Sequence, residues 1–246
     1  LASKGKGILA VDESTKTVGK RLAGIGVENT EENRKAYRGM LFTTEGLGKY
    51  ISGAILFEET LFQNHQDGEP MVKKLNDLGI IPGIKVDKGL NPLPGGGDVE
   101  TFCSGLDGLV ERAAKYYEQG ARFAKWRAVL QITDDGCPSK LSIQENAWGL
   151  ARYARSVQES GLVPIIEPEI LMDGAHTIEK TAEIQEEVIK QVYIACQANG
   201  VFLEGTLLKP SMTVNGAECT TKADPMKVAE MTIRTMERCV PASVPG

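Results

Sequence analysis

Charged side chains interrupt the short apolar runs of this 246-residue sequence, and their types suit chemistry on a carbonyl group. They occur as pairs two positions apart or as single residues at the end of a run: Lys85 and Asp87, Lys125 and Arg127, Glu167 and Glu169, Asp12, and Lys209. Residues two apart on a strand point to the same face of the sheet, and an unpaired buried charge costs several kcal/mol. One such pair is explained equally well as a structural ion pair. Three lysines, an arginine and several carboxylates at successive strand ends indicate a functional site instead.

Lysines that are crowded together acquire reactivity. A neighbouring cation and partial burial both favour the neutral amine, which can attack a ketone or an aldehyde to form a Schiff base. Adjacent carboxylates can carry the protons of that reaction. The pattern therefore predicts carbonyl chemistry on an anionic substrate, without a metal.

Histidine and cysteine do not form the patterns of a metal centre or a disulfide framework. The two histidines, His65 and His176, are far apart in the sequence, whereas a catalytic zinc site usually has at least one close pair of ligands. The five cysteines contain no Cys-x-x-Cys pair and are expected to be reduced thiols.

The overall charge and hydrophobicity exclude other function classes. The net charge is −5 at pH 7, which argues against nucleic acid or an anionic membrane as the main partner. No uncharged apolar run reaches the roughly 18 residues expected of a membrane-spanning helix. The sequence shows no secretory signal, but it begins at Leu1 and not at Met. The cellular compartment therefore stays open.

Strand-like apolar runs alternate with amphipathic helical stretches along the sequence. The expected strands are Gly7–Asp12, Ile51–Phe57, Ile81–Asp87, Arg122–Leu130, Leu162–Ile170 and Val201–Lys209. The expected helices begin after Thr30 and cover Gly108–Gln119, Ile143–Ser160, Ile178–Ala198 and Pro225–Arg238. This alternation is typical of an α/β fold with a parallel sheet, either an open doubly wound sheet or a closed (β/α)8 barrel.

The placement of polar residues favours the (β/α)8 TIM barrel. Barrel enzymes hold their chemistry at the carboxyl ends of the strands, where this sequence has a polar or charged residue after almost every strand. The Gly-x-Gly-x-x-Gly fingerprint and the Gly-Lys-Ser/Thr phosphate loop are absent. No linker divides the chain, so a single domain over residues 1–246 is expected. The sequence contains only six of the eight strand–helix units of such a barrel.

Five segments in matching order resemble the class I, Schiff-base fructose-bisphosphate aldolases. They are Gly7–Ser14, Gly83–Gly89, Phe123–Arg127, Val163–Ile170 and Leu203–Pro210. The resemblance runs from Leu1 to Gly246, and Tyr50–Leu61 and Trp148–Ala154 look like the plant or algal forms. It implies reversible cleavage of fructose 1,6-bisphosphate to dihydroxyacetone phosphate and glyceraldehyde 3-phosphate, in glycolysis, gluconeogenesis or the Calvin cycle, with no cofactor.

The resemblance implies catalytic roles for five residues. They are Lys209 as the Schiff-base lysine, Glu167 as the acid/base that assists dehydration, Asp12 as the group that handles the C4 hydroxyl proton, Lys125 as the cation beside it, and Glu169 as the orienting carboxylate. It implies substrate contacts for six more: Lys85 and Arg127 at hydroxyls and phosphate, and Ser14, Thr17, Arg21 and Arg34 around the C6-phosphate end. Ser14 is also explained as a helix cap, and the last two arginines as solvated helix charges.

The resemblance is incomplete at both ends. The leading helix and the seventh and eighth barrel units of the family have no counterpart, which favours the hypothesis that the sequence is part of a longer polypeptide. The family implies phosphorylated sugar substrates, a homotetramer, and a location in the cytoplasm or the plastid stroma. Two alternatives stay open, a transaldolase-like Schiff-base enzyme and a non-catalytic scaffold or interaction subunit on a truncated aldolase fold. Preference between fructose 1,6-bisphosphate and sedoheptulose 1,7-bisphosphate is open as well.

Overall fold

A computed structural model describes residues 1–246, and its main feature is a six-stranded sheet. In spatial order the strands are β1 (Gly7–Val11), β2 (Ile51–Leu56), β3 (Ile81–Lys85), β6 (Phe123–Leu130), β7 (Val163–Ile170) and β8 (Leu207–Leu208). The pairs β1–β2, β2–β3, β3–β6 and β7–β8 are parallel. The spatial order follows the chain order, as in a (β/α)8 barrel and not as in a doubly wound sheet.

Eight helices accompany the strands. They are α1 (Thr15–Ala23), α2 (Glu31–Phe42), α3 (Glu58–Phe62), α4 (Met71–Asp77), α5 (Leu109–Glu118), α6 (Lys140–Glu159), α7 (Ile178–Ala198) and α8 (Pro225–Cys239). Polar caps fix where three of the long helices begin: Thr30 for α2, Thr177 for α7 and Asp224 for α8 each accept a hydrogen bond from a first-turn amide. None of the helices has the length and apolar character needed to cross a membrane.

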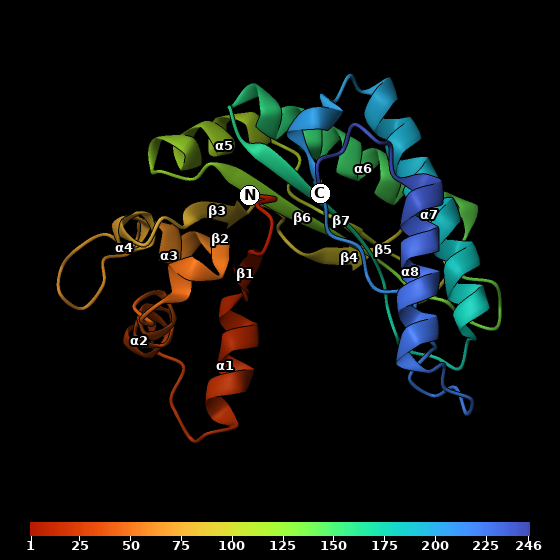
Figure 1. Cartoon of the computed structure of the whole chain (residues 1–246), viewed down its shortest axis with the longest axis horizontal. Coiled ribbons are helices and arrows are strands. Elements are labelled where there is room, and N and C mark those ends of the chain that lie inside the picture. The colour runs from red at the N-terminus through yellow and green to blue at the C-terminus, as the bar shows by residue number, and fades with distance from the viewer. The chain divides into compact units, whose positions relative to one another are not determined.

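The chain packs as two compact units. The first contains Leu1–Val86, Val110–Lys125 and Ser160–Val163, and the second contains Asp87–Leu109, Trp126–Glu159 and Pro164–Gly246. Within the second unit, α6, α7 and α8 pack in succession, and α7 and α8 lie side by side in Figure 1. The expectation of a single barrel domain stays a prediction.

Aromatic side chains make close contacts in both units. In the first unit, Gly83 of β3 faces Phe123 of β6 so closely that a Cβ at position 83 would lie 2.3 Å from the phenyl ring. In the second unit, Trp126 stacks on Tyr153 at 5.5 Å between ring centroids. The Tyr153 hydroxyl donates to the carbonyl of Ile165 at 3.2 Å, which ties α6 to β7. These contacts hold the strands that carry the charged residues.

The elements match the expected ranges closely, with one strand much shorter than expected. The expected strand Val201–Lys209 is reduced to Leu207–Leu208, preceded by a 3-10 turn at Leu203–Gly205. In this turn the amides of Gly205 and Thr206 donate to the carbonyls three residues earlier, which replaces strand pairing. A short antiparallel hairpin, β4 (Leu90–Pro92) with β5 (Thr101–Cys103), was not expected, nor were α1, α3, α4 and the 3-10 turn Leu47–Lys49.

Candidate active site

The first group of site residues lies in the first unit, around a buried ion pair. Asp12 directly follows β1, and its carboxylate oxygen lies 2.7 Å from the ammonium nitrogen of Lys125 on β6. Both side chains are buried. Lys85, the last residue of β3, is the register partner of Lys125, so the two lysines share one face of the parallel pair. The structure thus brings Asp12 and Lys125 together, with Lys85 on the neighbouring strand, and the roles of the three residues stay predictions.

The second group lies in the second unit, around Lys209. The Lys209 ammonium donates a hydrogen bond to the Glu167 carboxylate. Glu167 is buried on β7, whereas the Lys209 side chain is 45% exposed just after β8. The backbone amide of Lys209 donates to the carbonyl of Ile166 at 2.9 Å, which fixes this pairing. An accessible amine beside a buried carboxylate can act as a nucleophile with its own proton carrier.

Arg127 and Glu169 form a second ion pair in the same unit. The Arg127 Nε donates to the Glu169 carboxylate. Burial by itself would lower the pKa of Arg127, but the hydrogen bond to Glu169 and the charges of Glu169, Glu167 and Asp87 raise it above its ordinary value. Arg127 therefore stays a cation at every working pH, suited to holding hydroxyl or phosphate oxygens.

Three predicted phosphate-end residues lie on one face of α1. Ser14 caps this helix by accepting the amide of Thr17 at 3.3 Å, and the two hydroxyl oxygens are 3.1 Å apart. The spacing of positions 14, 17 and 21 places Arg21 on the same face, one turn further along. The hydroxyls at the start of a helix suit an anion because the helix dipole is positive there. The helix-cap explanation of Ser14 is thus correct, and it does not exclude a contact with phosphate.

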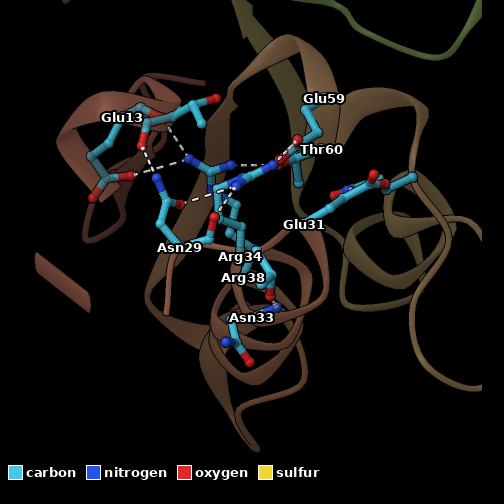
Figure 2. A network of polar contacts seen from close by, with 11 residues as sticks. Glu13, Asn29, Glu31, Asn33, Arg34, Arg38, Glu59 and Thr60 are labelled. Atoms are coloured by element: carbon cyan, nitrogen blue, oxygen red, sulfur yellow. Dashed lines mark hydrogen bonds and ion pairs between the residues drawn. The ribbon is translucent and has the colours of Figure 1, made fainter. Parts of the chain in front are cut away.

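Arg34 is occupied by neighbouring side chains. Its Nε and Nη2 donate to the two carboxylate oxygens of Glu59 at 2.9 and 2.6 Å, and its Nη1 donates to the carbonyl and side-chain oxygens of Asn29. Figure 2 shows Arg34 directed at Glu59. The hydrogen bond to Glu59 raises the pKa of Arg34 and lowers that of Glu59. Arg34 stays a predicted phosphate contact, and the geometry gives it a structural role.

Sequence reasoning did not single out Glu13 and Arg38, which belong to the same polar network. Arg38 is fully buried on α2 and donates to the Thr60 hydroxyl and to the backbone carbonyl of Glu13. The apolar residue Met40 of the same helix is exposed. The buried residues of the helix include Arg34, Arg38 and Phe42, and their four-residue spacing was the available signal.

One group of site residues lies in each unit. The first contains Asp12, Lys85, Lys125, Ser14, Thr17, Arg21 and Arg34, and the second contains Arg127, Glu167, Glu169 and Lys209. Lys125 and Arg127, which come from different groups, are two residues apart on β6. No cluster of three or more His, Cys, Asp or Glu side chains is arranged to hold a metal ion.

Known proteins similar to this chain share one family. A family model described as fructose-bisphosphate aldolase class I matches residues 1–246. The chain is 57% identical to fructose-bisphosphate aldolase 3, chloroplastic, of Arabidopsis thaliana and 56% identical to the chloroplastic enzyme of Oryza sativa subsp. japonica, over 246 residues in each case. Each alignment covers 100% of this chain, but 62% and 63% of those proteins. The chain therefore spans just under two thirds of their length.

A solved structure confirms the expected fold class. Fructose-bisphosphate aldolase from Plasmodium falciparum, crystallised in a ternary complex with TRAP and a small-molecule inhibitor, superposes with a TM-score of 0.98 at 57% identity. The match covers 100% of this chain and 71% of that one. The six strands and their helices are thus the matching part of the α/β fold of that protein.

Proposed function

Because the chain belongs to the class I fructose-bisphosphate aldolase family, we propose that it cleaves fructose 1,6-bisphosphate reversibly to dihydroxyacetone phosphate and glyceraldehyde 3-phosphate. The reaction proceeds through a Schiff base on Lys209, without a metal. The observation that carries this proposal is the hydrogen bond between the accessible Lys209 ammonium and the buried Glu167 carboxylate. An amine and a proton carrier in contact are what imine formation needs.

The first half of the reaction takes place at Lys209. Glu167 first takes a proton from the Lys209 ammonium, and the neutral amine then adds to the C2 carbonyl of the ketose and gives a carbinolamine. Glu167 delivers a proton to the C2 hydroxyl, which leaves as water, and a protonated imine forms. This imine withdraws electrons from the bond between C3 and C4, so that bond can break. Glu169 and Arg127, which are hydrogen-bonded to each other, orient the substrate and the acid/base group.

The second half needs a base at the C4 hydroxyl. Asp12 accepts that proton while the bond between C3 and C4 breaks, and the buried Lys125 ammonium beside it stabilises the carboxylate. Glyceraldehyde 3-phosphate leaves, and an enamine stays on Lys209. Protonation at C3 and addition of water then release dihydroxyacetone phosphate and restore the amine.

The remaining residues bind the phosphorylated substrate. Ser14, Thr17 and Arg21 on α1 contact the C6-phosphate, with Lys85 as a further cation and Arg34 as an outer contact. Sedoheptulose 1,7-bisphosphate is a second candidate substrate. We propose a homotetramer on family grounds, in the plastid stroma or the cytoplasm. The chloroplastic names of the plant relatives support the plastid.

Borohydride trapping tests the proposal directly. The protein is incubated with dihydroxyacetone phosphate, reduced with borohydride, and examined by intact mass and peptide mapping. We expect one reduced adduct on Lys209, its loss in Lys209→Arg, and its retention in the control Lys4→Arg, which changes an exposed lysine. An adduct on another lysine, or no adduct on protein that cleaves the substrate, overturns the mechanism. Cleavage that a chelator abolishes also contradicts it, and no adduct with no cleavage favours the scaffold alternative.

A further inference from the structure

Glu13 lies between two arginines of opposite exposure. Its Oε1 accepts a hydrogen bond from Arg21, whose side chain is 59% exposed on α1. Its Oε2 lies 3.7 Å from the Nη2 of Arg38, whose side chain is fully buried on α2. The Glu13 side chain itself is 11% exposed. One carboxylate is therefore within reach of a cation at the surface and of a cation in the interior.

Arg38 needs a negative charge nearby. Its Nη1 donates to the Thr60 hydroxyl at 2.8 Å and its Nη2 donates to the backbone carbonyl of Glu13 at 2.6 Å, whereas its Nε has no hydrogen-bond partner. Burial lowers the pKa of Arg38, and the charge of Glu13 is the largest opposing influence. A buried cation without a counterion is strongly destabilising, so the Glu13 carboxylate has a permanent function in the interior.

The neighbouring acid, Glu59, raises the pKa of Arg38 less than Glu13 does. Both oxygens of Glu59 are engaged by Arg34. In Figure 2, Glu13 and Glu59 lie on opposite sides of the two arginines, and the dashed lines assign a separate partner set to each acid. Glu13 is thus the acid that Arg21 and Arg38 share.

We propose that Glu13 is a positioning residue that competes with the substrate phosphate for Arg21. Without phosphate, the carboxylate holds Arg21. When a phosphate dianion binds Arg21 together with the Ser14 and Thr17 hydroxyls, Glu13 turns to Arg38 and stays paired. Displacement therefore leaves no charge unpaired, and the competition sets how tightly phosphate is held. This inference rests on the proposed function for the place of the phosphate.

The competition predicts opposite effects for a change of Glu13 and a change of Arg38. In Glu13→Gln the competitor is neutral, so phosphate binds Arg21 more tightly, by about two- to five-fold, the factor that one exposed ion pair contributes. In Arg38→Met the carboxylate loses its interior partner and stays on Arg21, so phosphate binds more weakly by a similar factor. The double variant behaves like Glu13→Gln because Arg38 acts only through Glu13. Arg38→Lys restores part of the wild-type affinity.

Inorganic phosphate binding, measured by calorimetry, is the direct test on wild type and these variants. The kinetic test is the KM for fructose 1,6-bisphosphate against that for fructose 1-phosphate, which lacks the second phosphate. We expect Glu13→Gln to lower the first KM and leave the second unchanged. The double variant replaces the buried pair as a whole, so it supplies the comparison if Glu13→Gln or Arg38→Met does not fold.

Several outcomes overturn the inference. They are unchanged phosphate affinity in Glu13→Gln, an equal change of both KM values, and phosphate binding that is weaker in Glu13→Gln than in wild type. If wild type cleaves neither sugar, the proposed function fails, whereas the phosphate titration still decides the role of Glu13. If neither wild type nor Glu13→Gln binds phosphate, the competition does not exist.

Discussion

The ion pairs of the candidate site differ in how deeply their two members are buried. Lys125 and Asp12 are both buried, Lys209 is accessible beside a buried Glu167, and Arg21 is exposed beside a nearly buried Glu13. Because desolvation disfavours an isolated charge, a buried carboxylate keeps its cation close and in one orientation. A substrate can therefore contact the solvent-exposed member of such a pair. The difference in exposure distinguishes Lys209, the predicted nucleophile, which is accessible, from Lys125, which is buried and is predicted to support Asp12.

The Arg34–Glu59 pair gives a pH-dependent prediction. The pKa of Glu59 is lower in the folded protein because Arg34 donates to its carboxylate. Such a group contributes stability that is fully present above its unfolded pKa of about 4.3 and is lost as the pH falls through the folded value. Glu59→Gln should therefore lower the free energy of unfolding by about 2 kcal/mol at pH 7, and by less below pH 4.

Denaturant unfolding at the two pH values measures this difference. Glu32→Gln is the matched control. Glu32 also forms an ion pair, at 3.4 Å from Lys35, but its side chain is exposed. Its change should stay within about 0.5 kcal/mol at either pH. An equal loss for Glu59→Gln at pH 7 and at pH 3 would show that packing and not charge explains it.

At the level of elements, the hydrophobic periodicity of the sequence predicted most strands and helices. It failed where local hydrogen bonds of a turn decide the backbone conformation. The range Ile178–Ala198 was predicted to the residue because its apolar period continues for five turns. Val201–Lys209 was predicted as a strand from its apolar residues, but the i to i+3 hydrogen bonds around Gly205 favour a 3-10 turn. The types of the site residues were readable from the sequence. The pairing of Arg34 with Glu59 was not, because it joins two helices across 25 positions.

Packing between α7 and α8 gives a prediction at this scale. Ile178, Ala182 and Met231 form a buried apolar cluster between the two helices. Met231→Ala should lower the free energy of unfolding by about 2–4 kcal/mol, since it leaves a cavity there. Met226→Ala on the same helix is the control, because this side chain is 78% exposed and should change stability by less than about 0.5 kcal/mol. Denaturant titration compares them, and equal losses would contradict the assigned packing.

For the whole molecule, the distribution of the five cysteines determines thiol reactivity. Cys196, Cys219 and Cys239 are buried, whereas Cys103 and Cys137 are half-buried. Burial raises the pKa of Cys196 to about 12, so almost no reactive thiolate is present at neutral pH. None of the five thiols forms a disulfide in the structure.

Titration with a thiol reagent checks this distribution. At pH 8 the native protein should react rapidly at no more than two thiols, and all five should react in guanidinium chloride. A variant with Cys103→Ser and Cys137→Ser should lose the rapid phase and keep the slow one. Rapid reaction of a third thiol in native protein, or a rapid phase that persists in this variant, would show that a cysteine placed in the interior is accessible.

The boundary between the two compact units passes through β6, between Lys125 and Trp126. The strand therefore supplies Lys125 to the Asp12 pair of one unit and Arg127 to the Glu169 pair of the other. Because side chains alternate along a strand, adding or removing one residue at its start would turn both away from their partners together. A change in length by a single residue at the start of Phe123–Leu130 would therefore cost both ion pairs.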